Sequence, residues 1–541
     1  MKKIQYYIII LLLLPWNPIF AQLDHLSFEP EENYRLNPSD VSQTEVFIVN
    51  SPLDRDVLFS SCNTLTFIPF FISEGIYVTT DGGTSWLGND TCTGEPMAFH
   101  GGDPGIAIDK DGVFIITRLG RSPFTGLYSH YSTDQGQTWS AQQVISTDDL
   151  ERASVATDYF PGSPYYGRTY AVWVKFAPPF PLMMAYTDDS GINWTGPEQI
   201  NNPPNRSAGG DICIGPNGEV YVCWAGVTDV SPFKEIYVGF ASSKSGGADW
   251  HISEEAFSMN GITGLLPDKG NIRVNGLPGI AVDTASGEKN GWIYIVSGQK
   301  GLLPAGSDPD IILNRSEDGG LSWSSGIRVN QDAPDNGKTQ YFPSVHVDKF
   351  GAVDIIFYDD RNTTIDSAGV FLSRTDDGGN SWKEYEISDH NYKPEPIGGL
   401  GQGYQGDNID LTSTDTRLCP VWMDNSTGVY QIWTVPIEFS SLDNIWERPQ
   451  NNASFELKQN RPNPFRGTTS ISFKTYAPAI VSLKVYDLHG KEVAMLIERY
   501  DHPGDHEIIF DAGKISNKAG IYIYSLTIDG VTRTCKMVAL P

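Results

Sequence analysis

The sequence is poor in basic residues and in cysteine. Its 541 residues contain 38 Lys and Arg against 66 Asp and Glu, which gives a formal net charge of −28. Such an acidic chain repels phosphate backbones, so no nucleic-acid partner is expected. Six cysteines are too few for a disulfide scaffold. The spacing leaves two candidate bridges, Cys213 with Cys223 across a hairpin and Cys62 with Cys92, with unpaired buried thiols as the alternative in each case.

Long apolar runs are also missing. The run Ile8–Leu14 follows Lys2 and Lys3 and precedes a small residue, Ala21. It is too short to span a bilayer, and the pattern predicts a secretory signal peptide over residues 1–21. No later segment approaches 18 apolar residues, so no transmembrane segment is expected in the mature chain. The protein is therefore expected to be exported.

What the sequence has in abundance is turn residues and a repeat. Gly (54) and Pro (35) are frequent and 40% of the residues are hydrophobic, which indicates an all-β chain with a real core. An octapeptide, Thr/Ser-x-Asp-x-Gly-x-x-Trp, recurs at intervals of 53 to 73 residues measured from Asp to Asp. Its five complete copies and one copy with Ser245 in place of Asp are Thr79–Trp86, Ser132–Trp139, Thr187–Trp194, Ser243–Trp250, Ser316–Trp323 and Thr375–Trp382.

Apolar hairpins alternate with these octapeptides. Gly105–Asp109 and Gly112–Ile116 form one example, and Ser344–Asp348 with Gly351–Ile356 form another. Near-continuous apolarity predicts inner strands that are buried on both faces. Seven hairpins and six octapeptides predict four-stranded units that close into a seven-bladed β-propeller, with six blades as the alternative. The last unit lacks an octapeptide, and a strand from the N-terminal stretch 26–35 is expected to complete it.

The octapeptide resembles the Asp-box, or BNR repeat, of the sialidase superfamily. The resemblance implies a structural hairpin loop, in which the Asp accepts backbone hydrogen bonds and the Trp packs between neighbouring sheets. A catalytic or metal-binding role of these residues is the less favoured interpretation. The structural residues so identified are Asp81, Asp134, Asp189, Asp318, Asp377, Trp86, Trp139, Trp194, Trp250, Trp323 and Trp382.

The pattern changes after Pro436. A polar linker is expected at 438–452, between a propeller at 22–437 and a small β-rich module at 453–541. The module contains Gln459–Phe465, Val481–Asp487 and Gly520–Tyr524, and it resembles the type A sorting domain of the type IX secretion system of Bacteroidetes. That resemblance implies the secretion machinery as a partner, passage through the periplasm, and release or attachment at the cell surface. An immunoglobulin-like carbohydrate-binding module is the alternative.

A ligand site is expected at the propeller axis, on the face where first strands begin and second strands end. The residues projected onto this face combine carboxylates, arginines and aromatics, a mixture that suits a sugar or a carboxylated sugar. The alternative for each residue is a strand cap or an ion pair. Clustered oxygens also suit a cation such as calcium, although no cofactor is required. The predicted substrate-binding residues are Arg118, Arg152, Asp211, Tyr358, Asp360, Arg361, Asp407 and Asp424.

The sialidase resemblance also implies candidate catalytic residues. Asp103 and Tyr404 are the candidate acid and nucleophile by position. The family's Phe/Tyr-Arg-Ile-Pro motif has its nearest match in Tyr34–Pro38, which is one residue too long. Two functions are therefore expected: a sialidase-like glycoside hydrolase, or a non-catalytic surface propeller that binds a glycan or a protein. A scaffold without a ligand is a third.

Overall fold

The computed structural model describes residues 32–67, 70–92, 100–442, 455–475, 479–487, 491–501, 504–515, 519–528 and 531–540. The predicted signal peptide and most of the predicted linker lie outside these residues. Most of the chain up to Asn444 forms one unit, and the residues from Ile445 onward form a second. No helix among the described residues is long and apolar enough to cross a membrane.

Six antiparallel four-stranded sheets follow one another along the larger unit, each with its strands in chain order. The first two sheets contain β2 (Ser42–Asn50), β3 (Leu58–Phe67), β4 (Phe70–Thr79) and β5 (Leu87–Asn89), then β6 (His100–Ile108), β7 (Phe114–Gly120), β8 (Gly126–Ser132) and β9 (Gln143–Ser146). The next two contain β10 (Ser154–Thr157), β11 (Thr169–Val174), β12 (Leu182–Thr187) and β13 (Thr195–Gln199), then β14 (Arg206–Ile214), β15 (Val220–Val227), β16 (Glu235–Ser243) and β17 (His251–Ser258). The last two contain β20 (Gly279–Val282), β21 (Ile293–Gln299), β22 (Asp310–Ser316) and β23 (Ile327–Arg328), then β24 (Gln340–Val347), β25 (Val353–Asp359), β26 (Gly369–Thr375) and β27 (Lys383–Glu386).

A further sheet joins the two ends of this unit. It contains β28 (Asp410–Ser413), β29 (Arg417–Asp424) and β30 (Gln431–Thr434), with β31 (Ile437–Glu438) also paired to β29. Its outer strand is β1 (Tyr34–Arg35), which pairs with Thr434 and Trp433. The expectation that an N-terminal strand completes the last unit is confirmed for these residues, and 26–31 lie outside the described chain.

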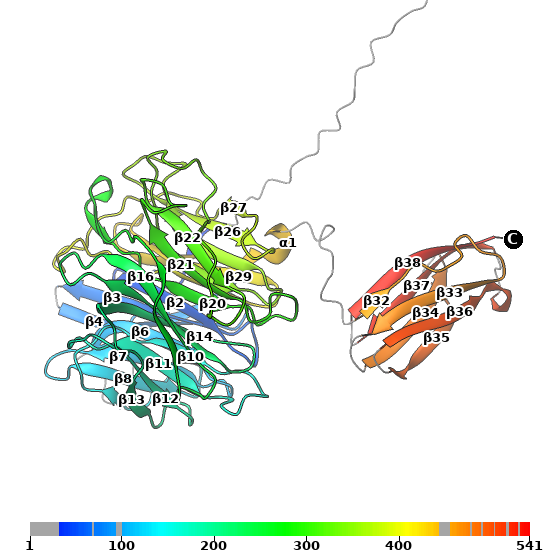
Figure 1. Ribbon diagram of the computed structural model, residues 1–541, viewed down its shortest axis with the longest axis horizontal. Helices are drawn as coiled ribbons and strands as arrows, with labels where there is room; N and C mark the ends of the chain where they lie inside the picture. The colour runs from blue at the N-terminus through cyan, green and yellow to red at the C-terminus, as the bar shows by residue number, and fades with distance from the viewer. Residues whose placement is uncertain are drawn as a thin grey trace, which may run out of the picture. The chain divides into compact units, whose positions relative to one another are not determined.

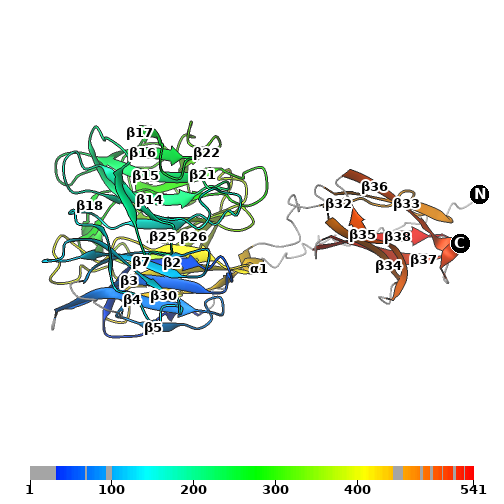
Figure 2. The same cartoon turned by 90° about the horizontal axis from the view of Figure 1, so that it is seen from below.

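The sheets form the ring of a β-propeller. The first strand of each sheet lies beside the first strand of the next, and β28 closes the ring against β2. Figure 1 shows β2, β6, β10, β14 and β20 near the middle of this unit and β4, β8 and β12 towards its edge. Figure 2 shows the same sheets from below. The all-β propeller class is confirmed, and the count of seven blades stays a prediction.

The octapeptides hold adjacent sheets together. Trp139, in the loop after β8, is 6% exposed and its ring centroid lies 5.8 Å from that of Phe59 on β3 of the preceding sheet. Trp323, after β22, packs in the same way on Phe240 and Phe257 of the preceding sheet, with centroids 5.2 Å away in both cases. Each of these tryptophans thus buries its ring between two sheets.

An inserted segment separates β17 from β20. It contains the hairpin of β18 (Gly264–Leu266) and β19 (Ile272–Val274), joined by a 3₁₀ turn at Pro267–Lys269. Lys269 is buried and donates hydrogen bonds to Asp360 Oδ2 at 2.7 Å and to the carbonyls of Ile365 and Ser367 at 2.9 Å. This contact fixes the insertion against the loop between β25 and β26.

The cysteines are unpaired in the described residues. The predicted bridge between Cys213 and Cys223 is wrong, because Cys213 lies opposite Tyr221 and Cys223 lies opposite Asp211. Cys62 and Cys92 are buried free thiols, so the second predicted bridge is wrong as well. Burial raises the pKa of the Cys213 and Cys223 thiols well above the ordinary value.

The smaller unit is a sandwich of two antiparallel sheets. One sheet has the order β32 (Phe455–Leu457), β33 (Thr468–Thr475) and β36 (Gly504–Asp511). The other has the order β35 (Glu492–Asp501), β34 (Ala479–Asp487), β37 (Gly520–Ile528) and β38 (Val531–Ala539). Phe465, Phe473 and Tyr524 belong to its own hydrophobic core, and Figures 1 and 2 label its strands.

Candidate functional site

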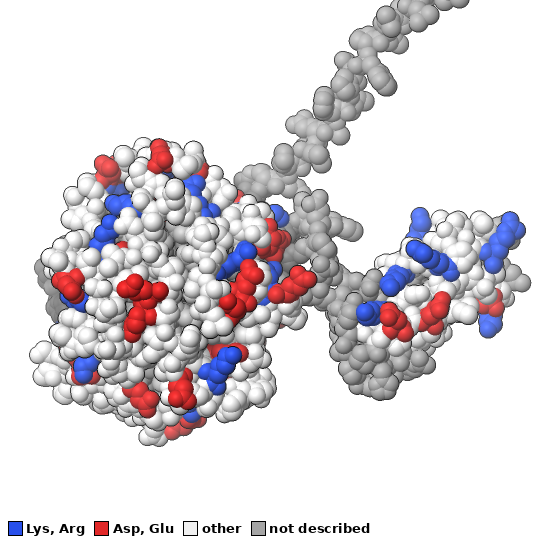
Figure 3. Space-filling view, viewed as in Figure 1, with Lys and Arg blue, Asp and Glu red and all other residues white. Residues whose placement is uncertain are grey.

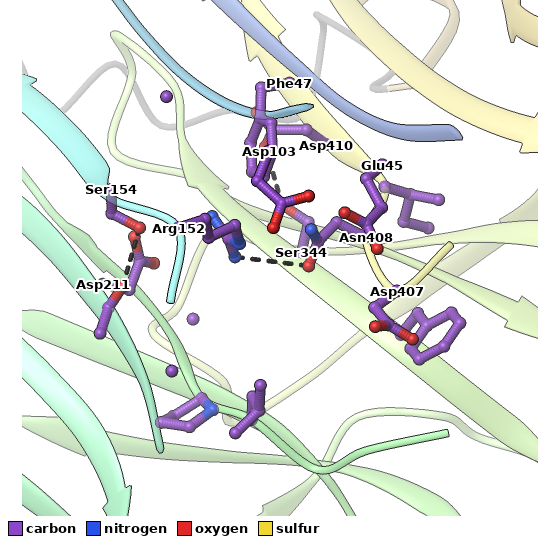
Figure 4. A pocket seen from close by; sticks show the side chains of 18 of the residues that line it. Glu45, Phe47, Asp103, Arg152, Ser154, Asp211, Ser344, Asp407, Asn408 and Asp410 are labelled. Atoms are coloured by element: carbon purple, nitrogen blue, oxygen red, sulfur yellow. Dashed lines mark hydrogen bonds between the residues drawn. The ribbon is translucent and has the colours of Figure 1, made fainter. Parts of the chain in front are cut away.

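A cavity of about 350 Å³ lies at the propeller axis, where the first strands begin. Its volume is at the lower end of the roughly 300–1,000 Å³ range of small-molecule sites. Its ionisable lining residues come from separate strands or the segments that precede them: Glu45, Asp103, Glu151, Arg152, Asp211, Arg273, Tyr404, Asp407 and Asp410. Figure 4 shows most of these side chains turned towards a common space.

Bulges in the first strands turn several of these residues towards the cavity. The pairing of β2 with β3 shifts between Thr44 and Phe47, and that of β6 with β7 shifts between Gly102 and Gly105. Glu45 and Asp103 lie within the two bulges, with left-handed φ angles of 56° and 55°. Non-glycine residues rarely adopt this conformation, which costs about 1–3 kcal/mol and concentrates at functional sites. The bulges therefore mark the axial ends of these strands as a candidate site.

One asparagine joins three groups of the site. The Asn63 Nδ2 amide donates to Glu45 Oε2 and to Asp103 Oδ1, both at 2.9 Å, and lies 3.3 Å from the Tyr404 hydroxyl. The Asp103 backbone N–H donates back to Asn63 Oδ1 at 2.5 Å. Two carboxyl groups are thus held side by side by a neutral donor.

The inserted segment supplies one arginine. Arg273 donates to both Asp407 carboxylate oxygens, from Nε at 3.1 Å and from Nη2 at 2.5 Å. Its guanidinium also lies 4.9 Å from the centroid of the Tyr404 ring. This bidentate geometry leaves Arg273 already paired.

The second arginine has no such partner. Arg152 lies over the Phe47 ring, 4.6 Å from its centroid, and donates one long hydrogen bond of 3.4 Å to Asn408 Oδ1. Its guanidinium forms no ion pair within the described residues. Figure 4 shows its side chain reaching from the side of Ser154 and Asp211 towards Asn408. Arg152 is therefore available to an anionic or hydroxyl group in the cavity.

Three carboxyl groups of the cavity, those of Glu45, Glu151 and Asp407, have raised pKa values. Burial and the neighbouring Asp103 carboxylate raise the pKa of Glu151 to about 7 and that of Glu45 well above its ordinary value. Burial also raises the pKa of Asp407, although its hydrogen bond with Arg273 opposes the rise. Burial among like charges thus favours the protonated forms of these carboxyl groups, as is common in functional sites.

Two deeper carboxyl groups connect neighbouring sheets. Asp211 Oδ2 accepts the Ile280 backbone N–H at 2.9 Å, and Asp410 Oδ2 accepts the Ile48 backbone N–H at 3.0 Å. Burial raises the pKa of Asp211, and it raises that of Asp410 to about 7. Both residues line the cavity and also hold the ring of first strands together.

The predicted site residues fall into two groups. Five line the axial cavity: Asp103, Arg152, Asp211, Tyr404 and Asp407. The other five do not line it: Arg118, Tyr358, Asp360, Arg361 and Asp424. Their roles in binding a substrate stay predictions, and their contacts favour structural roles.

Arg361 shows the difference most clearly. It donates to Asp359 Oδ2 from Nε at 2.7 Å and to Glu384 Oε2 from Nη1 at 2.6 Å. Its guanidinium also lies 4.6 Å from the Phe371 ring centroid. These contacts use both sides of the planar group, as expected for the ion-pair alternative.

The remaining four residues are buried in the frame of the propeller. Arg118 donates to His130 Nε2 at 3.1 Å and to Gln142 Oε1 at 2.9 Å. The Tyr358 hydroxyl donates to the Met423 carbonyl at 2.5 Å. Asp360 pairs with Lys269, as described above. Asp424 Oδ2 lies 3.0 Å from His390 Nε2, and Asp389 Oδ1 lies 2.6 Å from Nδ1 of the same ring. The hydrogen bonds with Asp424 and, to a lesser extent, with Asp389 raise the pKa of His390 to about 9.

The projection onto the axial face also included Glu45 and Glu151, but three residues were missed. Asn63 lies on β3, which contains several other polar residues, so it gives no separate signal. Arg273 lies in the insertion, and the signal for it was the longest interval between octapeptides, 73 residues from position 245 to position 318. Asp410 is the first residue of β28 and follows Asp407 by three positions. Arg35 of the sialidase-like motif pairs on β1 and lies over Trp433 rather than lining the cavity.

No group of three or more His, Cys, Asp or Glu side chains in the described parts of the chain is arranged to hold a metal ion. Calcium binding stays a prediction. The surface outside the cavity carries mixed charge, and Figure 3 shows acidic and basic side chains dispersed over one face of the larger unit, with broad uncharged areas between them.

The octapeptides contain a different kind of carboxylate. In the second copy, Asp134 Oδ1 accepts the Ser132 hydroxyl at 2.7 Å and the Thr138 backbone N–H at 2.9 Å, while Oδ2 accepts the Thr138 hydroxyl at 2.6 Å. Asp81, Asp189, Asp318 and Asp377 repeat this pattern. These bonds lower the pKa of Asp134, that from the Thr138 hydroxyl first. The hydrogen-bonding capacity of the Asp carboxylate is thus used by donors within the same turn.

The propeller is similar to several solved structures at low identity. A polysaccharide lyase of family PL25, an ulvan lyase, is 10% identical with a TM-score of 0.45, covering 73% of this chain and 94% of that one. An alpha-L-arabinanase from Penicillium chrysogenum is 12% identical with a TM-score of 0.42, covering 64% and 98%. NanB sialidase from Streptococcus pneumoniae is 10% identical with a TM-score of 0.39, covering 60% and 66%. No curated protein matches the sequence.

The smaller unit has a clearer relationship. Residues 461–539 match the family model described as a secretion system C-terminal sorting domain. This range lies within the module expected from the sequence and contains six of the seven strands of the sandwich. The C-terminal module is therefore a type IX sorting domain, which directs the protein to the cell surface or the medium.

Proposed function

We propose that the exported protein binds a glycan in the axial cavity of its propeller. The observation that supports this most is the combination of Arg152, without an ion pair, with several carboxyl groups and the Phe47 and Tyr404 rings in one cavity. Sugars present hydroxyl groups, which donate to carboxylates, and ring faces, which pack on aromatic side chains. Such converging groups in a concave site are typical of ligand sites.

A hydrolytic role is the second candidate, and Glu151 is the observation that favours it. Its pKa of about 7 suits a general acid near neutral pH, and Asp103 lies close enough to raise that pKa. Glycoside hydrolysis uses two carboxyl groups, one of which donates a proton to the leaving oxygen. In this role Glu151 donates the proton and Asp103 acts as the base or nucleophile. The non-catalytic binder uses the same cavity without this step.

The experiment is a glycan-binding panel and a fluorogenic glycoside panel on the mature chain, residues 22–541, with and without calcium. The wild-type protein, Arg152→Gln and Glu151→Gln are compared. Binding that Arg152→Gln weakens supports the proposal. Turnover that Glu151→Gln abolishes while binding persists adds the hydrolytic role. Binding without turnover identifies a lectin-like protein, and the absence of binding to any glycan contradicts the proposal.

A further inference from the structure

A short motif recurs in the loops between the second and third strands of three successive sheets. It is Pro-Phe, at Pro123-Phe124, Pro179-Phe180 and Pro232-Phe233. Phe124 is 48% exposed and Phe233 is 38% exposed, whereas Phe180 is partly buried against a core cluster. These loops lie on the face where the cavity opens, because the second strands end and the first strands begin there.

Two of these rings enclose an arginine. The Arg206 guanidinium carbon lies 4.0 Å from the Phe180 ring centroid and 4.3 Å from the Phe233 ring centroid. Phe180 and Phe233 both have left-handed φ angles, 61° and 60°, which are uncommon for bulky residues and require support from their surroundings. The two loops thus adopt a costly conformation that places a ring on each side of Arg206.

The Arg206 side chain has no hydrogen-bond acceptor among the residues that the structure describes. Its buried Nε atom lacks a hydrogen-bond partner, and its guanidinium forms no ion pair within the described residues. The stacked arginine of the adjacent sheet behaves differently. Arg168 lies 3.7 Å from the Tyr186 ring centroid and donates to both Asp188 carboxylate oxygens at 2.8 and 2.9 Å. In a chain with a net charge of −28, an arginine kept away from carboxylates is notable.

Arg206 lies on a strand that contributes three residues to the lining of the axial cavity. It is the first residue of β14, and Gly209, Gly210 and Asp211 of the same strand line the cavity. The Cα atoms of Arg206 and Asp211 are at most about 17 Å apart along an extended strand. Arg152 lies close enough to Asp211 to lower its pKa against the effect of burial. Arg206 thus begins the strand that carries Asp211, and Arg152 lies near Asp211; neither arginine forms an ion pair with another described residue.

We propose that Arg206 is a second anion-binding position, and that the glycan is polyanionic, with carboxylate or sulfate groups on more than one sugar. The inference rests on the proposed function, because it extends the ligand from the cavity to the rim. A guanidinium fixed between two rings keeps its planar fork free for a bidentate anion and loses little side-chain freedom on binding. One negative group of the glycan lies at Arg152 and a second at Arg206.

The test uses calorimetric titration of the mature chain with galacturonate tetramer, its neutral methyl ester, a sulfated chondroitin tetrasaccharide and galacturonate monomer. The galacturonate tetramer carries carboxylates alone, whereas the chondroitin tetrasaccharide carries carboxylates and sulfates, so binding of the second without the first assigns the recognition to sulfate. Arg206→Gln is compared with Arg168→Gln, which removes a stacked arginine that already has a partner. Thermal melts are recorded for every variant, and Arg206→Lys, which keeps the charge but not the fork, replaces Arg206→Gln if that variant does not fold.

We expect at least one anionic tetramer to bind more tightly than the methyl ester. Arg206→Gln should weaken that binding by about tenfold, or about 1.4 kcal/mol, and leave monomer binding unchanged. Arg168→Gln should bind the tetramer like the wild type. Equal affinity of Arg206→Gln and wild type for the tetramer overturns the inference, as does a lower melting temperature without a change in affinity. Binding of neutral glycans only also overturns it, while leaving the proposed function intact. If no glycan binds, the proposed function itself fails.

Discussion

Aspartates at the axis and aspartates in the octapeptides belong to the same propeller but differ in their surroundings. Asp134 receives three hydrogen bonds from residues within four positions of itself, and its pKa is lowered. Asp103 is held by Asn63 from another sheet and lies among acidic groups whose pKa values are raised. The octapeptide aspartates have their hydrogen bonds supplied within the turn and so stabilise the fold. The axial carboxyl groups repel one another, and a ligand that donates hydrogen bonds to them can offset that repulsion.

The largest effect should come from the octapeptide tryptophans. Replacing Trp139 with Ala removes a ring that is 6% exposed and packed on Phe59, so we expect about 3–5 kcal/mol lower free energy of unfolding. Trp139→Phe, which keeps most of the ring, should cost much less. Urea denaturation measures both. A Trp139→Ala protein with unchanged stability and altered glycan binding would contradict the view that the octapeptides stabilise the fold and the axial cavity binds the ligand.

Aspartate substitutions should separate the two regions next. Asp134→Ala leaves three donors without their acceptor, and we expect about 1–2 kcal/mol lower stability with unchanged binding. Asp103→Asn should leave stability equal or higher, because it removes a charge from an acidic cluster and Asn tolerates a left-handed φ. It should change glycan binding instead. Weaker glycan binding by Asp134→Ala, or a lower melting temperature with unchanged binding for Asp103→Asn, would refute the comparison.

The smallest effect should appear in the pH dependence of stability. Glu151 has a folded-state pKa of about 7, above its ordinary value, so the folded protein binds a proton that the unfolded chain releases. Its contribution is fully present below about pH 4.5 and is lost as the pH rises towards 7. Glu151→Gln should therefore flatten the decline in unfolding free energy between pH 5 and 8. Identical profiles for variant and wild type would remove Glu151 from the buried acidic cluster.

The repeated parts of the molecule were predictable because their causes are local. A turn Asp, its hydroxyl partners and a Trp occur within eight residues, so the sequence showed each octapeptide and, by alternation, each hairpin. The closing strand at Tyr34–Arg35 followed from the same count of strands. The candidate site was half predictable, since Asp103, Arg152 and Asp407 lie at strand starts, where the projection placed them.

The remaining parts depend on partners that are distant in sequence. Arg361 follows β25 as expected, but Glu384 on the outer strand β27 neutralises it. No pattern in the sequence indicates that this side chain reaches Arg361. Arg273 enters the cavity from an insertion. Lys269 fixes that insertion by its contact with Asp360, which is 91 residues away in the sequence. Such contacts are set by tertiary packing rather than by periodicity.

The central claim is that function lies in the axial cavity and not in the octapeptides. The most direct measurement is calorimetric titration of wild type, Arg152→Gln and Asp134→Ala with the tightest glycan of the panel, below the melting temperature of each protein. We predict that Arg152→Gln weakens binding more than tenfold, about 1.4 kcal/mol or more, while Asp134→Ala binds like wild type. Equal affinity of Arg152→Gln and wild type, or loss of binding in the folded Asp134→Ala protein, would contradict the account.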